Sequence, residues 1–411
     1  MKIKQLLSAL LAFMVLFSAL TACGSTTSDE PSSTGSTSSS VESGTDDTAV
    51  YVDRSAVYAY DDNAPSLYEA FSQWFKVGTA MNTSDLVEGS EEMEILIKQY
   101  NVFTLENESK PDAMHPSEDV YNFEALDKLV EFANEYDKTV RGHVLVWHSQ
   151  CPDWFFYDDD GNTVSADVLV ERMKEHITTI VSHYQGEVDV WDVVNEVLGD
   201  NGGLRDSMWY QIIGDYDGDG DKYDFIEIAF TTAHEADPDA RLVINDYSLE
   251  SSEDKTITMY MMVKNMLEEG IPIDGISLQM HIDINFDVET CKNNVEILMK
   301  LKEIDPDFVI EITELDLSCF SWDDQSTEVE LTDEFVEKFD SLYSDIFEML
   351  IEFSEAGYLD SVVMWGYNDG STWLNSYPVS GRTNHPLLID EDYKLKSAYW
   401  ALIDLAASKS S

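Results

Sequence analysis

Eight short apolar runs, rich in β-branched and aromatic residues, alternate along this chain with segments of helical periodicity. The runs cover residues 75–80, 102–105, 140–147, 188–195, 242–246, 275–281, 308–313 and 361–365. Between several of them, apolar residues recur every three to four positions, as they do in 125–136, 258–269 and 289–302. Strands that alternate with helices in this number favour a closed barrel over an open sheet. We therefore predict an α/β fold, a (β/α)8 TIM barrel.

Polar or aromatic side chains stand at the ends of several predicted strands. They are Glu106, His148, Glu196, His281, Glu314 and Trp365. A barrel of this type builds its active site from residues at the carboxyl ends of its strands, whereas a buried strand has no structural need for an acid there. The sequence therefore predicts that an active site lies at that end of the barrel.

Two of these segments carry the most specific chemistry. One reads W-D-V-V-N-E and ends at Glu196, and the other reads V-I-E-I-T-E-L-D and contains Glu314 and Asp316. Cleavage of a glycosidic bond needs two carboxyl groups, because one protonates the leaving oxygen while the other attacks the sugar or activates water. Acids that only form surface salt bridges are not expected at the ends of two apolar strands, so we favour the catalytic interpretation.

The charge of the chain limits its partners. It has 81 Asp and Glu residues against 24 Lys and Arg residues, for a formal net charge of −57. A surface this negative repels phosphate groups and anionic lipids, so no nucleic-acid partner is expected. A neutral or cationic partner is compatible with it, although a solvated acidic surface without any partner is the simpler explanation.

The N-terminal segment has the features of a targeting sequence. Lys2 and Lys4 precede an apolar stretch from residue 6 to residue 20, which is short for a membrane span. The sequence Leu-Thr-Ala-Cys that ends at Cys23 resembles a bacterial lipobox. That resemblance implies that residues 1–22 are a lipoprotein signal peptide and that Cys23 carries the lipid. The mature protein would then be extracellular and anchored to the cell-surface membrane without spanning it; an ordinary secretory signal is the alternative.

The composition of the remaining chain divides it into two parts. Residues 23–50 are rich in Ser, Thr, Gly and Asp and predict a flexible tether. Residues 51–411 contain no second linker and predict a single catalytic domain. Cys151, Cys291 and Cys319 are an odd number, so at most one disulfide can form among them, and the sequence does not indicate which.

Several motifs in the predicted domain, taken together, resemble a known family. The chain contains L-E-N-E-S-K at 105–110, R-G-H-V-L-V-W-H-S-Q at 141–150, N-D-Y at 245–247, Q-M-H at 279–281 and W-G-Y-N-D-G-S-T-W-L at 365–374. With the two acidic segments, in this order, they closely resemble the signatures of glycoside hydrolase family 10, the retaining endo-β-1,4-xylanases. The resemblance extends over essentially the whole domain and implies hydrolysis of xylan and xylo-oligosaccharides without a cofactor.

The resemblance also implies roles for individual residues. Glu196 would be the general acid/base and Glu314 the nucleophile. Asn195 would hydrogen-bond the sugar 2-hydroxyl, while His281 and Asp316 would support the nucleophile. Hydrogen bonds to the charged form of a carboxylate favour its ionisation, which a nucleophile needs, whereas the acid/base must hold a proton when the substrate arrives.

Sugar-binding positions follow from the same resemblance. Those for hydroxyl groups on the non-reducing side are Glu106, Asn107, Lys110, His143 and Gln150. Tyr247 would lie towards the leaving group, Gln279 would be a further substrate-binding residue, and the glycone walls would be Trp147, Trp365 and Trp373. Two positions depart from the family's pattern. Cys151 would be a buried free thiol beside Gln150, and Arg382 would stand in for an arginine that the family commonly has in a nearby loop.

An acidic segment at 215–221 reads D-Y-D-G-D-G-D. Asp215, Asp217, Asp219 and Asp221 form the opening of a calcium-binding loop of the EF-hand type. Such a loop needs an acid at its twelfth position, which is Ile226 here, and the nearby Asp224 and Glu227 are out of register. The sequence therefore leaves two interpretations open, a calcium site and a solvated acidic loop.

Two other functions compete with that of a xylanase. A β-1,4-glucanase, or an enzyme active on both polymers, would use the same acids, because the two sugars differ only by a hydroxymethyl group. A sugar-binding lipoprotein would also carry a lipid anchor, a tether and aromatic side chains, but it would have no use for the complete catalytic set. We expect a monomer whose chemistry requires no metal or organic cofactor.

Overall fold

The computed structural model describes Arg54 and residues 57–410. The predicted signal peptide, Cys23 and the predicted tether lie outside the described residues. Among the helices of the described chain, none combines the length and the apolar character that a membrane span requires.

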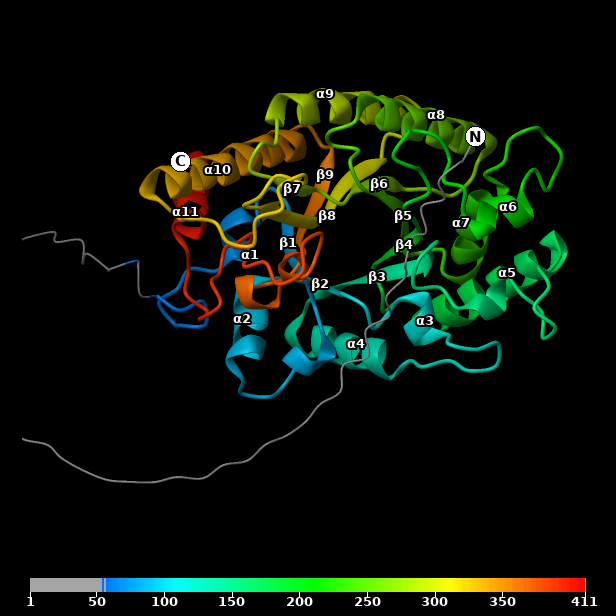
Figure 1. Ribbon diagram of the computed structural model, residues 1–411, viewed down its shortest axis with the longest axis horizontal. Coiled ribbons are helices and arrows are strands. Elements are labelled where there is room, and N and C mark those ends of the chain that lie inside the picture. The colour runs from blue at the N-terminus through cyan, green and yellow to red at the C-terminus, as the bar shows by residue number, and fades with distance from the viewer. Residues whose placement is uncertain (1–53, 55–56, 411) are drawn as a thin grey trace, which may run out of the picture. The chain divides into compact units, whose positions relative to one another are not determined.

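Eight parallel strands close into a barrel, as the alternation of strand-like and helical segments predicted (Figure 1). They are β1 (Lys76–Met81), β2 (Val102–Leu105), β3 (Thr139–Val146), β4 (Val190–Asn195), β5 (Arg241–Asp246), β6 (Gly275–Leu278), β8 (Val309–Ser318) and β9 (Leu359–Met364). Each strand pairs with its sequence neighbour, except that β6 pairs with β8, and pairing of β9 with β1 closes the ring. A short strand, β7 (His281–Asp283), extends the sheet alongside the end of β8.

Helices surround the barrel and cover its strands. The longer ones are α2 (Glu91–Gln99), α4 (Glu124–Tyr136), α5 (Ala166–His183), α7 (Asp224–Ala236), α8 (Glu253–Glu269), α9 (Val288–Leu298), α10 (Asp333–Glu355) and α11 (Ser397–Lys409). The short ones are α1 (Leu67–Phe71), α3 (Pro111–Met114) and α6 (Met208–Ile213), with 3-10 turns η2 (Thr83–Asp85), η3 (Asp153–Phe155), η4 (Met299–Glu303), η5 (Asp369–Ser371) and η6 (Trp373–Asn375).

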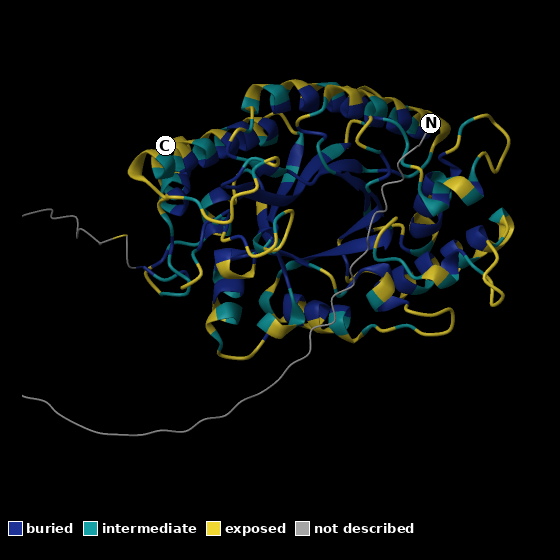
Figure 2. Cartoon of the chain, viewed as in Figure 1, coloured by how far each residue is buried: buried dark blue, intermediate teal, exposed yellow. Residues whose placement is uncertain are grey.

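Helix α5 shows how the sequence sets these elements. The side chain of Ser165 accepts a hydrogen bond from the backbone N–H of Val168 and so caps the start of the helix. Leu169, Met173 and Ile177 then recur at four-residue spacing and are buried against the barrel. Figure 2 shows the same arrangement around the barrel: the strands inside are buried, and the exposed residues lie on the outer faces of the helices.

The strands themselves are buried on both faces, which explains why they read as continuous apolar runs. Gly142 on β3 is one place where this packing fixes the residue type. A Cβ atom there would lie 2.2 Å from the indole ring of Trp191 on β4. Trp191 is 1% exposed and is therefore a core residue, not part of a sugar site.

Three predicted segments were wrong in extent. The run at 275–281 is not one strand, because Met280 adopts a left-handed φ of 56° that separates β6 from β7. The run at 308–313 extends to Ser318, because β7 pairs with the last residues of β8. Glu314 and Asp316 consequently lie within a strand and not after it. The predicted helix at 289–302 also ends early, at Leu298, and continues as a 3-10 turn.

The three cysteines of the described chain are all free. Cys291 and Cys319 are buried, and the prediction that the thiol of Cys151 is free is confirmed. Cys151 as a whole residue is of intermediate exposure, but burial of its thiol raises the pKa of that group. The single disulfide that the sequence allowed does not form.

Candidate active site

A cleft of about 920 Å³ lies at the carboxyl ends of the strands. Its lining residues include Glu106, Asn107, Lys110, His143, Trp147, Gln150, Asn195, Glu196, Tyr247, Gln279, His281, Glu314, Trp365 and Trp373. These are all the predicted catalytic, supporting and sugar-binding residues except Asp316, which contacts His281 from behind the lining. Residues from at least six strands or strand ends meet here, as the barrel geometry requires.

Glu314 is held by two donors from neighbouring strands. It is 5% exposed, its Oε2 lies 3.0 Å from Nε2 of His281, and its Oε1 accepts a hydrogen bond of 2.7 Å from Nδ2 of Asn245. Burial opposes ionisation, but the hydrogen bond and positive charge of His281 more than offset it and lower the pKa of Glu314 to about 2. Glu314 is therefore ionised at neutral pH.

Asp316 holds the opposite side of the His281 ring. Its Oδ2 lies 3.0 Å from Nδ1 of His281 and accepts a hydrogen bond of 2.7 Å from Nε1 of Trp373. Burial alone would lower the pKa of His281, but the carboxylates of Asp316 and Glu314 raise it to about 10. The ring is therefore a cation between two carboxylates, those of Glu314 and Asp316.

Glu196 stands directly after β4 in an environment of a different kind. Its backbone has a left-handed φ of 54°, which is uncommon for a residue with a side chain and is held here by a backbone hydrogen bond to β5. Its side chain is 18% exposed. Nε2 of Gln279 donates to its Oε1 over 3.3 Å and also to Oδ1 of Asn195 over 3.2 Å. Glu196 thus faces the cleft with fewer fixed partners than Glu314.

A set of polar side chains forms one side of the cleft. Nζ of Lys110 donates to Oδ1 of Asn107 and to Oε1 of Gln150, over 3.1 and 3.0 Å. Lys110 is 6% exposed, and this burial lowers its pKa although nearby acids oppose the shift. Glu106, at the end of β2, accepts a hydrogen bond of 3.2 Å from Asn82. Lys110, Asn107 and Gln150, three of the predicted hydroxyl-binding residues, therefore form a connected group.

Aromatic rings form the apolar side of the cleft. The ammonium group of Lys110 lies 4.9 Å from the ring centroid of Trp147 and 5.9 Å from that of Trp365. His143 contacts Trp365 edge-on, with ring centroids 5.5 Å apart. The rings of Trp147 and Trp365 thus lie beside Lys110, and the ring of Trp373 lies 4.8 Å from that of His281.

Comparison with known proteins agrees with this geometry. The sequence profile of glycosyl hydrolase family 10 matches residues 66–405. The chain belongs to this family. The family 10 assignment confirms the resemblance seen in the motifs, and it accords with the barrel and with the position of the cleft.

Relatives of this family 10 chain include endo-1,4-beta-xylanase C of Paenibacillus barcinonensis, which is 42% identical over 86% of this chain and 33% of its own length. Endo-1,4-beta-xylanase A of Thermoanaerobacterium saccharolyticum is 39% identical over 84% of this chain and 28% of its own length. This chain therefore spans about a third of the length of these relatives. It spans 98% of the endo-1,4-beta-xylanase of Geobacillus stearothermophilus, which is 40% identical over 83% of this chain.

Solved structures of family 10 proteins share the fold of this chain. A family 10 structure from Paenibacillus barcinonensis has a TM-score of 0.81 at 43% identity and covers 84% of this chain and 98% of its own. A mutant structure in complex with xylotriose has a TM-score of 0.76 at 39% identity and covers 83% of this chain and 100% of its own.

Some residues of this family 10 cleft were missed by sequence reasoning. Asn245 was noticed only as part of a motif, yet its Nδ2 donates to both Asn195 and Glu314 and its Oδ1 accepts from Thr313. Arg205 was not noticed at all. Its guanidinium group lies 4.0 Å from Oε2 of Glu196 and donates to the backbone oxygen of the same residue over 2.7 Å. No strand or helix pattern marks Arg205, because it stands in a loop.

His148 is a further lining residue, which the sequence indicated only as a polar residue at the end of a predicted strand. Its Nε2 lies 3.8 Å from Oε2 of Glu196. Burial and the charge of Arg205 lower the pKa of His148 to about 4, so its ring is neutral at neutral pH. Tyr247 lies on the same side, where its hydroxyl group donates to Asp200 and accepts a hydrogen bond from Arg205.

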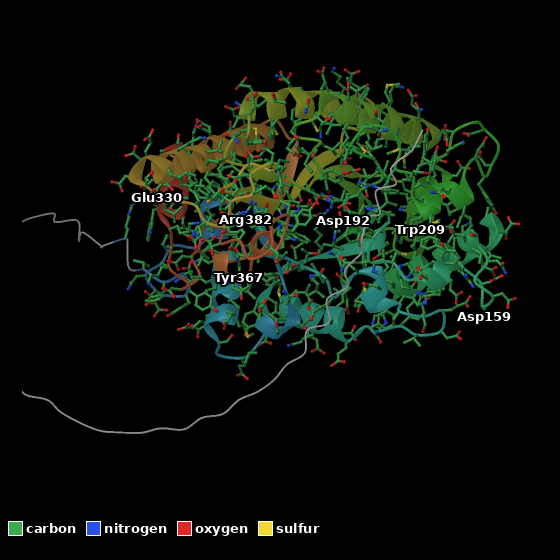
Figure 3. All side chains as sticks on the ribbon, in the orientation of Figure 1. Asp159, Asp192, Trp209, Glu330, Tyr367 and Arg382 are labelled. Atoms are coloured by element: carbon green, nitrogen blue, oxygen red, sulfur yellow. The ribbon has the colours of Figure 1, made fainter. Side chains whose placement is uncertain are left out.

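Two other sequence predictions fall outside the cleft. Arg382 is 3% exposed and donates to the backbone oxygens of Asp324 and Ser326, so it holds a loop and does not replace an arginine in the cleft. Figure 3 labels it. The acidic residues Asp215, Asp217, Asp219 and Asp221 lie in the loop between α6 and α7, apart from the cleft lining.

Proposed function

We propose that this protein is an endo-1,4-β-xylanase that hydrolyses internal β-1,4-xylosidic bonds by a retaining double displacement. The observation that carries the proposal is that two carboxyl groups in one cleft have different surroundings. Glu314 is fixed and ionised by His281 and Asn245, while Glu196 is left partly exposed beside Gln279. A retaining glycosidase needs this combination of a permanent nucleophile and a group that gives up and regains a proton.

Glu314 would act first as the nucleophile. An ionised Oε atom attacks the anomeric carbon, the bond to the leaving oxygen breaks, and a glycosyl ester forms. His281 and Asn245 orient the carboxylate. Trp373, which donates to Asp316, fixes the support behind His281. These contacts keep the nucleophile in place at no further entropic cost when the substrate binds.

Glu196 would donate its proton to the departing oxygen and then accept one from the water that hydrolyses the ester. Asn195 would assist at the sugar 2-hydroxyl. Its Oδ1 already accepts from Asn245 and Gln279, which leaves its Nδ2 group to donate to that hydroxyl. Such a bond strengthens as positive charge develops on the sugar in the transition state.

Xylan and xylo-oligosaccharides are the substrates that we propose. The names of several relatives include endo-1,4-beta-xylanase, and one related structure is described as a complex with xylotriose. The rings of Trp147, Trp365 and Trp373 restrict the space around the bound sugar. A second candidate is β-1,4-glucan, because a relative from Acetivibrio thermocellus, 38% identical to this chain, is named an exoglucanase.

We also propose that the enzyme is a monomer and an extracellular lipoprotein, with Cys23 as the lipidated residue after removal of residues 1–22. The support is the lipobox-like sequence and the polar tract that follows it. Labelling with a fatty acid in the producing cell should mark the full chain and should be lost in a Cys23→Ser variant. Labelling that persists in the variant would exclude this anchor, and sedimentation of the purified chain would test the monomer.

The substrate is tested by reducing-sugar release from xylan and from a soluble cellulose derivative, with Glu314→Gln as the blank. We expect release from xylan that is lost in the variant and little release from cellulose. Comparable release from both polymers would identify the broader glucanase. Oligosaccharide binding without release from either would contradict the enzyme and favour a sugar-binding protein.

A further inference from the structure

The loop between α6 and α7 gathers acidic side chains outside the catalytic cleft. Its backbone turns around them, since Oδ1 of Asp217 accepts from the N–H of Asp219 and Oδ1 of Asp219 accepts from the N–H of Asp221. Asp215 accepts from the N–H of Gly220 over 3.4 Å. Figure 1 shows α6 and α7 beside each other at the right of the barrel. These bonds shape the loop but do not by themselves indicate a ligand.

Asp224, at the start of α7, has a feature that does indicate a ligand. It is 3% exposed, and its Oδ2 accepts from the backbone N–H groups of Tyr216 and Asp217. Its Oδ1 is buried and has no hydrogen-bond partner in the described chain. A buried carboxylate oxygen without a partner is rare, because it loses its hydration without compensation.

Other carboxylate oxygens, which are possible metal ligands, lie close to Asp224. One carboxylate oxygen each from Asp215, Asp217 and Asp224 lie within 4.8 Å of one another, and the same is true of Asp219, Asp221 and Asp224. Oxygens at that spacing can each lie 2.3–2.6 Å from a common ion, which is the distance of calcium ligands. Asp224 belongs to both groups and therefore lies at their junction.

We propose that this loop binds Ca²⁺ through Asp224 and the neighbouring aspartates. Carboxylates alone form a hard donor set, which calcium prefers and which a thiol- or imidazole-seeking metal does not. Mg²⁺ is the weaker candidate because it demands octahedral geometry and keeps its water. The EF-hand register predicts an acid at Ile226, but the fold instead brings in Asp224, two positions earlier.

A second acidic loop of the same chain shows what a solvated cluster looks like. Asp158 accepts from the backbone N–H groups of Asp160 and Asn162, and the loop around Asp159 is exposed. Figure 3 labels Asp159 at the edge of the molecule. None of these four residues has a buried polar side-chain atom without a hydrogen-bond partner. The difference between the two loops is therefore the buried oxygen of Asp224, not the density of acids.

The site would also affect the cleft through α6. Trp209 on this helix is 2% exposed, and its Nε1 donates to the backbone oxygen of Trp147 over 2.9 Å. Figure 3 labels Trp209. An ion that fixes the loop after α6 would therefore hold the segment that supports Trp147, a wall of the sugar site. The expected effect is on stability, since Trp147 does not take part in bond cleavage.

Calorimetric titration with CaCl2 tests the site in the chelator-treated full chain, at an ionic strength that screens loose counterions. We compare the unaltered protein with Asp224→Asn and with the exposed control Asp159→Asn. We expect saturable binding in the unaltered protein and in the control, and an affinity at least about tenfold weaker in Asp224→Asn. Calcium should raise Tm in the first two proteins, by more than MgCl2 does, and not in the third.

Equal calcium affinity in Asp224→Asn and in the unaltered protein would overturn the proposal. So would weak, unsaturable binding in all three proteins, which would identify a solvated acidic loop. Because Asp224 is buried, its variant could fail to fold, so the exposed pair Asp217→Asn with Asp219→Asn is measured in parallel. This pair should also lose the calcium-dependent rise in Tm, and an undiminished rise in it would contradict the site.

Discussion

Two clusters of charged residues lie on the same strands of this barrel, one in its interior and one in its cleft. The interior network consists of Arg141 on β3, Asp192 on β4 and Glu311 on β8, each 1–2% exposed. The cleft pair consists of Glu314, three positions beyond Glu311 on β8, and Glu196, four positions beyond Asp192 and directly after β4. Because the strands are parallel, the first cluster lies deeper in the barrel and the second at its carboxyl end. Figure 3 labels Asp192 in the interior.

The two clusters differ in how completely their charges are paired. Arg141 contacts both Asp192 and Glu311 and also donates to Ser277 over 2.9 Å. Arg241 adds a second guanidinium to Glu311, at 3.1 Å. In the cleft, Glu314 has a charged partner, whereas Glu196 has an amide at 3.3 Å, the neutral imidazole of His148 at 3.8 Å and a guanidinium at 4.0 Å. The barrel thus neutralises the charges that it buries and leaves one acid free to exchange a proton.

Irregularities in the strands separate the clusters. The register shifts between Asp192 and Val194 on β4, and on either side of Ile312 on β8. Side chains alternate between the two faces of a regular strand, so residues three apart would face opposite ways. The shift allows Glu311 and Glu314 to contact two residues of β5, Arg241 and Asn245. Bulges of this kind commonly re-aim side chains near active sites.

The largest effect is expected from the two glutamates of β8. Glu314→Gln should lower kcat on xylan by at least about 10⁴-fold, because it removes the nucleophile. Glu311→Gln should instead lower the free energy of unfolding by about 3 kcal/mol, because Arg141 and Arg241 lose a buried partner. Xylanase assays and denaturant unfolding on both variants separate the two effects. A stability loss in Glu314→Gln as large as that in Glu311→Gln would contradict the assignment of a catalytic role to one glutamate and a structural role to the other.

The acid of β4 gives the next effect. Glu196→Ala should lower kcat on xylan by about 10²–10⁴-fold, since proton donation to the leaving oxygen is lost. An aryl xyloside whose leaving group is already acidic needs little proton donation, so its first bond cleavage should be nearly unaffected. Burst kinetics on such a substrate measure that step.

Asp192→Asn is the matched control on the same strand, because Asp192 pairs with Arg141 and His143 and not with the substrate. It should act mainly on stability, as Glu311→Gln does. An equal loss on both substrates in Glu196→Ala would show that Glu196 does not serve as the acid.

The ion pair of His281 and Glu314 should make stability depend on pH. The pKa of Glu314 is lowered from 4.5 to about 2, so its contribution is complete above pH 4.5 and is lost as the pH falls towards 2. The pKa of His281 is raised from 6.5 to about 10, so its contribution is complete below pH 6.5 and is lost as the pH rises towards 10.

The stability advantage of the unaltered protein over a His281→Gln, Glu314→Gln double variant should therefore be largest between pH 4.5 and 6.5. Urea unfolding midpoints across the pH range measure this difference. A difference that does not change with pH would mean that the pair is not ionised in the folded protein.

The smallest effect is expected at the rim, where charge pairing has no part. Trp322 lines the cleft and is 40% exposed, so it can contact a polymer but not the reacting bond. Trp322→Ala should raise KM for xylan by about two- to tenfold and leave kcat unchanged. Leu331→Ala is the control, because Leu331 is 47% exposed and does not line the cleft. A fall in kcat for Trp322→Ala would place this residue nearer the chemistry.

The sequence predicted the barrel and most of the cleft because both depend on patterns that repeat along the chain. Each strand is an apolar run, and several end near a polar or aromatic residue, so Glu106, His148 and Trp365 could be placed at one end of the fold. The motifs around Glu196 and Glu314 then identified the family. The position of each of these residues in the fold is set by the strand that directly precedes or contains it in the sequence.

The residues that the sequence did not reveal depend on contacts between distant segments. Arg205 and Trp322 stand in loops, where no periodicity indicates whether a side chain faces the cleft. The extent of β8 could not be read from its residues, because its last part is a strand only through pairing with β7. The spacing of an EF-hand loop does not include Asp224 among the ligands. Asp224 contacts the acidic loop only because α7 begins at this residue, beside Tyr216 and Asp217.

The stereochemistry of the first product tests the division between Glu314 and Glu196 most directly. Proton NMR of a xylo-oligosaccharide digest, recorded before the anomers interconvert, shows which anomer is released. We predict that the β-anomer appears first, because a covalent ester to Glu314 and a second displacement together retain the configuration. Initial release of the α-anomer would mean that Glu314 activates water in a single displacement, and it would contradict the proposed roles of both acids.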